Sequence, residues 1–164
     1  MTTPDPEAMS DAELAAERPP EPAPAAHLSL PNIGLVAVGG AVGTALRYWL
    51  TLVLPPAHGI PVAILTANVL GAFVLGLLLE ALSELGPDHG VSRRIRLGVG
   101  TGLLGGFTTY STLATDTVTI GLAATPIAIA YGVGTVVVGA LASIVGIALA
   151  RRLIRPVIRA RRAA

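Results

Sequence analysis

The sequence of 164 residues contains no cysteine, no lysine and few aromatic side chains (4%). The absence of cysteine excludes disulfides, thiolate metal sites and cysteine nucleophiles within this chain. Charged residues are also scarce at 13%, whereas 52% of the residues are hydrophobic and the mean hydropathy is +0.71. A soluble domain rarely carries so little charge over long apolar runs. The composition therefore predicts that the lipid bilayer is the solvent of the folded chain.

The charge that is present gathers at the two ends of the chain. Residues 1–31 hold six of the ten acidic side chains and one arginine, while residues 151–164 hold six of the eleven arginines and no acid. The first segment is rich in Pro, Ala and Glu and lacks the basic start and apolar core of a signal peptide, so we expect a disordered acidic tail. The second is expected to be a basic cytoplasmic tail that anchors on anionic headgroups, and we expect no nucleic-acid partner.

Four apolar segments lie between these tails, at 32–54, 61–82, 95–120 and 126–150. Each is long enough to cross a hydrocarbon core of ~30 Å, which takes ~20 helical residues. Prolines and a glycine mark the connections, and short connections make neighbouring helices antiparallel. Small residues recur every three or four positions, as at Gly39 and Gly43, which lets helices approach closely in lipid. The sequence therefore predicts an all-α integral membrane protein, with residues 32–150 forming one domain of four transmembrane helices.

The distribution of arginine predicts an orientation. With four spans, both ends of the chain and the loop after the second span share one side of the membrane. That side carries ten of the eleven arginines, whereas the connections at 55–60 and 121–125 carry none. Because positively charged flanks stay in the cytoplasm, we expect a multi-pass protein of the inner or plasma membrane with both termini cytoplasmic.

Two polar side chains inside the apolar segments are candidates for function, because such groups are costly in a membrane. Arg47 is expected to place a fixed positive charge at the mouth of an anion path; alternatively, it reaches the interface beside Tyr48 and Trp49. Asn68 is expected to donate its amide hydrogens to a dehydrated anion; alternatively, the amide bridges two helices. No paired carboxylates, Ser/His/Asp set or phosphate loop are found, so we expect no enzymatic activity.

The third apolar segment contains the sequence LLGGFTTYSTLATDTV, which begins at Leu103. Its glycine pair followed by two threonines predicts a break in the helix, and a break in lipid persists where the freed carbonyls coordinate an ion or line a polar cavity. The hydroxyls of Thr108, Thr109, Ser111, Thr112 and Thr115 can solvate an anion. Alternatively, each hydroxyl bonds back to the carbonyl one turn earlier.

Three stretches together resemble the motifs of the Fluc (CrcB) fluoride channel family: GGAVGTALRYWL, TANVLGAF and LLGGFTTYSTLATD. They occur in the order and at the spacing of that family, over residues 33–150, and GGFTTYST is the most specific of them. The resemblance implies four-helix subunits with a break in the third helix. It also implies that two subunits pair as an antiparallel, dual-topology dimer with two fluoride pathways and a structural sodium ion at its centre.

The resemblance also implies roles for individual residues. The sodium ion would be held by the backbone carbonyls of Gly105 and Thr108. The fluoride pathway would be lined by side chains from all four segments, namely Arg47, Asn68, Tyr110, Ser111, Thr112, Tyr131 and Thr135. Asp116 stands where an acidic residue is usual in the family. Fluoride would pass by electrodiffusion, leaving the cytoplasm and relieving its toxicity.

Two features depart from the family pattern. The chain has TTYSTL where the family has TTFSTF, so Leu113 lacks the aromatic edge of a pathway phenylalanine, and Gly139 stands where serine is frequent. The strong arginine bias is also unexpected in a chain that inserts in both orientations. We therefore expect either a homodimer or, as a hypothesis that fits both departures, a heterodimer with an oppositely oriented paralogue.

Two other functions remain open at this point. A small dual-topology drug/proton antiporter would need a carboxylate buried within a helix as proton carrier, and the first segment has only Arg47. A non-conducting accessory membrane subunit would tolerate TTYSTL easily. Fluoride flux through the chain, alone or with a partner, distinguishes these functions.

Overall fold

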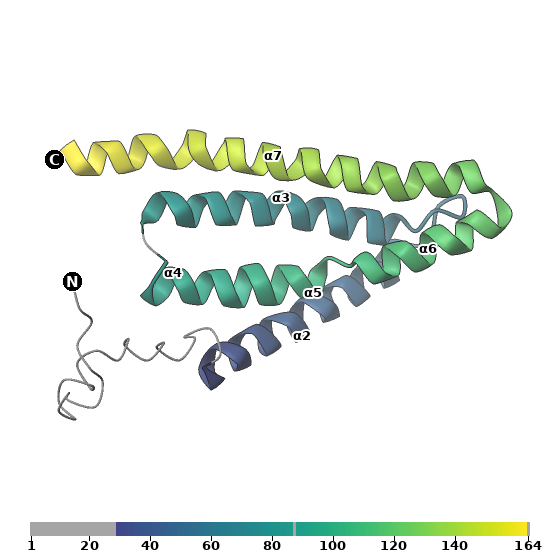
Figure 1. Ribbon diagram of the computed structural model, residues 1–164, viewed down its shortest axis with the longest axis horizontal. Coiled ribbons are helices and arrows are strands. Elements are labelled where there is room, and N and C mark those ends of the chain that lie inside the picture. Colours follow the sequence, from purple (N-terminus) through teal and green to yellow (C-terminus); the bar gives the residue numbers. More distant parts are fainter. Residues whose placement is uncertain (1–28, 87, 164) are drawn as a thin grey trace, which may run out of the picture.

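Figure 1 shows the computed structural model, in which residues 29–86 and 88–163 are described, with side chains described to Pro156. The acidic tail predicted for residues 1–31 therefore lies almost entirely outside the described part. The described elements are helical: α2 (Leu30–Val53), α3 (Val62–Leu85), α4 (Gly90–Ile95), the π-helix η3 (Arg96–Leu104), α5 (Gly105–Phe107), α6 (Tyr110–Ala123) and α7 (Thr125–Ala163). An isolated β-bridge between Ala57 and Ile60 closes the turn after α2.

Within the described ranges, three helices are long and apolar enough to cross a membrane: α2, α3 and the Thr125–Pro156 part of α7. They correspond to the first, second and fourth predicted segments, and α2 and α3 end within a few residues of the predicted bounds. Helix α7 differs, because it continues through the predicted end at residue 150 to Ala163. The residues assigned to a separate basic tail thus extend the last helix.

The third predicted segment is built from several short helices. The predicted break is confirmed, and it lies at Thr108 (φ −79°, ψ 157°) and Thr109 (φ −152°, ψ 124°), both of which are extended. The glycine pair before it does not open the helix, since Gly105 and Gly106 remain helical in α5. The π-helical turns of η3 upstream were not predicted.

Close approach between backbones explains the glycines of α2 and the third segment. A Cβ atom at Gly43 would lie 2.0 Å from the carbonyl oxygen of Leu103, and one at Gly106 would lie 2.3 Å from the carbonyl oxygen of Gly40. The long helices α3 and α7 use the same device, because a Cβ atom at Gly146 would lie 2.2 Å from the carbonyl oxygen of Phe73. The small-residue faces predicted from the sequence are therefore the contact surfaces between helices.

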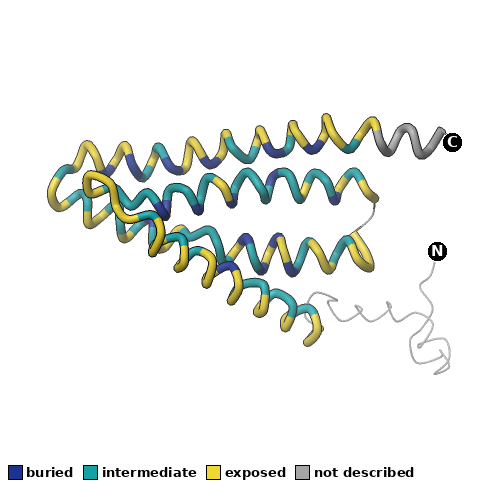
Figure 2. The backbone as a smooth tube through the Cα atoms, turned by 180° about the vertical axis from the view of Figure 1, so that it is seen from behind, coloured by how far each residue is buried: buried dark blue, intermediate teal, exposed yellow. Residues whose placement is uncertain are grey.

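The four segments leave most of their apolar surface uncovered. Figure 2 shows exposed residues along the outer faces of all the long helices, with buried residues confined to inner strips. A small core joins Ile64, Leu113 and Tyr131, whereas Leu46, Val136 and Ile144 are 44%, 56% and 60% exposed. Apolar side chains exposed over so large an area require lipid or another membrane protein as neighbours.

Candidate ion site at the break in the third segment

Asn68 of α3 holds the break in place. Its Nδ2 donates to the carbonyl oxygen of Thr109 at 3.0 Å, and the backbone N–H of Thr109 donates to its Oδ1 at 2.8 Å. The two groups of an amide side chain thereby replace the helical partners that the extended backbone of Thr109 has lost. The structure thus shows the bridging contact, and one of the two Nδ2 hydrogens remains for another acceptor.

Arg47 of α2 crosses the same break from the other side. Its Nε donates to the carbonyl oxygen of Gly106 at 3.3 Å, and its Nη1 donates to Oγ1 of Thr112 at 3.2 Å. One guanidinium therefore ties the helix before the break to the helix after it. Arg47 is half-buried and directed into the protein, so it does not extend toward Tyr48 and Trp49, which are both exposed.

Thr44 also contacts the Gly106 carbonyl, through an Oγ1 donor at 3.4 Å. The sequence reasoning did not single out this residue. Its position three residues before Arg47 could have indicated it, because residues three apart share one face of a helix.

The hydroxyls of the third segment divide into two groups. Thr108 and Thr115 bond back to the carbonyls of Leu104 and Ser111, at 2.9 and 3.0 Å, as the alternative interpretation expected. Oγ1 of Thr109 instead caps α6 by accepting from the backbone N–H of Thr112 at 3.2 Å. It also lies 3.0 Å from the Thr112 hydroxyl and 3.2 Å from the Ser111 hydroxyl. Three hydroxyls therefore cluster at the start of α6.

The carbonyls of Gly105 and Thr108, which were predicted to bind sodium, lack their helical hydrogen bonds because the N–H groups that would donate to them bond to side chains. The N–H of Thr109, which would bond to the Gly105 carbonyl in a continuous α-helix, donates to Asn68. The N–H of Thr112, which would bond to the Thr108 carbonyl, donates to the Thr109 hydroxyl. Such carbonyls retain the lone pairs that a hard cation prefers.

An open pocket of about 280 Å³ lies beside the break. It is lined by polar and apolar residues of three segments, among them Asn68, Thr108, Thr109, Tyr110, Leu113, Thr135 and Gly139. The structure thus brings together Asn68, Tyr110 and Thr135 of the predicted pathway, and the two departures from the family pattern lie among them. Tyr110 is 80% exposed, so most of its side chain is free to contact lipid or another chain.

Tyr131 lies deeper than the pocket, in the core with Ile64 and Leu113. The hydroxyl of Thr135 donates to the carbonyl oxygen of Tyr131 at 2.6 Å. Among the described residues, Oη of Tyr131 and Oδ2 of Asp116 are both buried without a hydrogen-bond partner, and the two groups interact electrostatically. The side chain of Ser111, in contrast, is exposed next to the break.

Several apolar membrane-crossing helices around a braced polar break define this chain as a multi-pass helical membrane protein. The model of the CrcB-like protein family (Camphor Resistance, CrcB) matches residues 34–147. The chain belongs to this family, as the motifs of the sequence predicted.

Several similar proteins are named for their activity. The "Fluoride-specific ion channel FluC 2" of Leifsonia xyli subsp. xyli is 48% identical over 124 residues, which cover 75% of this chain and 86% of the relative. The "Fluoride-specific ion channel FluC" of Ruminiclostridium cellulolyticum is 34% identical over 77% of this chain and 94% of the relative. The "Fluoride-specific ion channel FluC 1" of Cutibacterium acnes is 52% identical over 51% of this chain and 59% of the relative.

Proposed function

We propose that this chain is a subunit of a fluoride-selective channel that lets fluoride leave the cytoplasm passively. The observation that carries the proposal is the break at Thr108 and Thr109, which is braced by Arg47 and Asn68 and opens on a mainly apolar pocket that the polar side chains of the break also line. Relatives that are 34–52% identical are fluoride-specific ion channels by name, and none of those names describes an enzyme or an antiporter.

The polar groups in and around the break suit a small, strongly hydrated anion. Fluoride must exchange its water for other donors at each step, and each donor must bind weakly enough for the ion to leave. The free Nδ2 hydrogen of Asn68 and the hydroxyls of Ser111 and Thr112 supply such donors. The exposed edge of Tyr110 adds positive partial charge, Arg47 attracts the anion, and Tyr131 and Thr135 continue the path on α7.

A sodium ion fits the break as a structural partner. The carbonyls of Gly105 and Thr108 have lost their helical donors, whereas those of Gly106 and Thr109 already accept from Arg47 and Asn68. Two carbonyls from one subunit are too few for a hard cation, which takes six to eight oxygen ligands in the case of calcium. A second subunit that brings the same break to the site would supply the rest, so the sodium proposal and the dimer proposal support each other.

The dimer proposal also draws on the exposed apolar surface. A groove of about 530 Å³ between α6 and α7 is lined almost wholly by apolar side chains and begins at Tyr110. We propose an antiparallel, dual-topology arrangement of two four-span subunits in the cell membrane. The arginine bias favours an orientation with both termini in the cytoplasm. If all copies adopt it, the second subunit is an oppositely oriented paralogue; if copies insert both ways, the second subunit is a copy of this chain.

Fluoride efflux from liposomes tests the function. Purified chain is reconstituted alone and together with a paralogue from the same genome, and released fluoride is followed with a selective electrode. Passive flux down the fluoride gradient, with no flux of chloride, supports the proposal. Flux that requires a proton gradient would indicate an antiporter. Absence of flux, both from the chain alone and from the chain with the paralogue, would indicate a non-conducting accessory subunit. Replacement of sodium by a bulky organic cation during purification should reduce the flux.

Orientation is tested separately on the same cysteine-free background. Single cysteines at Thr3 and Ala163 are probed in cells with a membrane-impermeant thiol reagent. Protection of both sites from the outside supports one orientation and hence a paralogous partner. Comparable labelling from both sides supports insertion in both orientations and a homodimer.

A further inference from the structure

One end of the structure gathers arginine side chains from two elements, the α4 region and α7, which lie on either side of α3 (Figure 1). The start of α2, the turn between α3 and α4, and the C-terminal part of α7 all lie at this end (Figure 1). Among the described residues, the arginines here are Arg93, Arg94 and Arg96 of the α4 region and Arg151, Arg152 and Arg155 of α7. Arg93 and Arg94 of α4, which follow the turn between α3 and α4, are termed the loop arginines.

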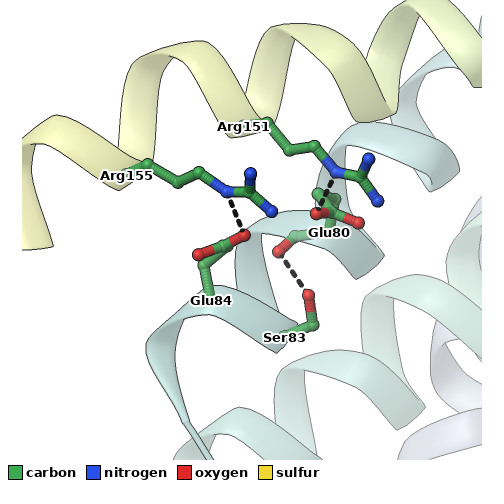
Figure 3. Close-up of polar contacts among 5 residues, drawn as sticks. All are labelled: Glu80, Ser83, Glu84, Arg151 and Arg155. Atoms are coloured by element: carbon green, nitrogen blue, oxygen red, sulfur yellow. Dashed lines mark hydrogen bonds and ion pairs between the residues drawn. The ribbon is translucent and has the colours of Figure 1, made fainter.

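Each described acid at this end is already paired with another arginine. Arg151 donates to Glu80 at 2.6 Å and Arg155 donates to Glu84 at 2.7 Å, so that α7 is tied to the end of α3 (Figure 3). Asp88 forms a two-point pair with Arg96, and this hydrogen bonding lowers the pKa of the Asp88 carboxyl from its ordinary value.

The loop arginines have no such partner. In the described part of the chain no hydrogen bond or ion pair joins Arg94 to an acid, and the buried Nε of Arg93 has no acceptor. Of the ten acids in the sequence, three are used at this end and Asp116 lies beyond the break on α6. The other six are Asp5, Glu7, Asp11, Glu13, Glu17 and Glu21.

The packing of α2 fixes where the chain before Leu30 starts relative to the loop arginines. Helix α2 and the third segment run in the same direction, since Gly98 packs on Leu35 and Gly102 packs on Gly39. The same register carried back to the start of α2 places Leu30 level with Arg93. Glu21 precedes Leu30 by nine residues, which span at most ~30 Å when extended.

We propose that the acidic N-terminal segment, residues 5–21, docks on the loop arginines Arg93 and Arg94. Charge complementarity favours the contact, because this segment holds six acids and a single arginine. Tethering favours it as well, because the segment leaves the fold beside its binding surface and so has a high effective concentration there. The contact is independent of fluoride conduction, since it depends only on charge and on the register of α2.

The test measures how fast the tail reaches each surface in the full chain, which has no native cysteine. Two cysteine pairs are compared in phosphatidylcholine vesicles: Ala16→Cys with Val91→Cys beside the loop arginines, and Ala16→Cys with Leu153→Cys on α7. Leu153 is a matched control for Val91 because both are exposed apolar residues at this end, with exposed fractions of 59% and 71%. We expect the first pair to form its disulfide about tenfold faster, since docking raises the local concentration.

Removing the charges of the loop arginines, or screening them with salt, should abolish the difference between the two disulfide rates. Arg93→Gln with Arg94→Gln should lower the rate of the first pair to that of the second, whereas Arg152→Gln, which removes one positive charge from α7, should leave it unchanged. Raising the salt from ~0.1 to ~1 M, which shortens the Debye length from ~10 to ~3 Å, should act like the double substitution.

Three results would overturn the proposal. The first is equal rates for the two pairs in wild-type background. The second is a fast first pair that is insensitive to both salt and the double substitution. The third is loss of the fast rate when anionic phosphatidylglycerol is added to the vesicles, because that result assigns the loop arginines to lipid headgroups in a native membrane.

Discussion

The side chain of Asn68 and the main chain of Thr109 form a closed pair of hydrogen bonds, at 3.0 and 2.8 Å, across 41 residues of sequence. The amide supplies one donor and one acceptor at the spacing that an extended residue presents. The break in the third segment is therefore not a loosely held loop, because α3 satisfies its central residue on both sides. Any ion that uses the break meets a backbone whose geometry is fixed beforehand.

Replacing Asn68 should damage both stability and flux. Asn68→Ala leaves the N–H and C=O of Thr109 without partners, at a cost of about 1–3 kcal/mol for each buried group, and removes an anion donor. Asn68→Asp keeps the acceptor for the Thr109 N–H but turns a carboxylate oxygen toward the Thr109 carbonyl, so it should also be destabilised, and its negative charge should stop fluoride. Thermal unfolding in detergent and liposome efflux measure the two effects.

The control for Asn68 is Thr66→Val, an almost isosteric change on the same helix at a groove away from the break. It should leave stability and efflux near the wild-type values. Wild-type flux in Asn68→Asp would contradict the placement of this residue on the fluoride pathway.

Arg47 should not be replaceable by lysine. The guanidinium reaches the Gly106 carbonyl and the Thr112 hydroxyl at the same time, and a lysine ammonium cannot reproduce this planar fork. Loss of a hydrogen bond from a charged group costs about 1.5–3 kcal/mol, so Arg47→Lys should be destabilised by a similar amount. Its fluoride efflux should resemble that of Arg47→Gln more than that of the wild type. Full efflux in Arg47→Lys would show that charge alone is needed at this position.

The sequence predicted the break and most of the residues around it, because the glycine pair, the threonine pair and the hydroxyls are local signals. It did not predict which residues would open. Gly105 and Gly106 are helical because α2 needs the close approach at Gly106, so the break moves to the threonines, whose backbone is satisfied by Asn68. That outcome depends on a contact between two helices and is not visible in the local sequence.

Long-range pairing also explains what was missed elsewhere. The last helix was expected to end at residue 150, before the arginine-rich residues 151–164. The pairs of Arg151 with Glu80 and of Arg155 with Glu84 carry α7 onward along α3. The π-helical turns of Arg96–Leu104 have no sequence pattern of their own, and they follow from packing.

The contact between α2 and the third segment should be sensitive to a single methyl group. A Cβ atom at Gly43 would lie 2.0 Å from the carbonyl oxygen of Leu103 and 2.8 Å from the backbone nitrogen of Phe107. Gly43→Ala should therefore separate the helices and destabilise the fold by about 1–3 kcal/mol, as overpacking does in a close-packed interior. Gly34→Ala on the same helix meets nothing within 4 Å and should have little effect on the melting temperature. Equal melting temperatures for the two variants would contradict this packing.

Leu113 is the position at which the chain should gain activity by substitution. Its side chain is only 5% exposed, yet it lines both the pocket beside the break and the apolar groove between α6 and α7. A larger ring therefore has adjacent space, and its edge would offer positive partial charge to an anion in the pocket. If the pathway through this subunit is impaired by the missing ring, Leu113→Phe should raise the fluoride efflux of the chain reconstituted alone by several-fold. Leu113→Met, which changes the shape without adding a ring, should not raise it. An unchanged rate in Leu113→Phe, at equal protein incorporation, would show that this position does not limit the flow of fluoride.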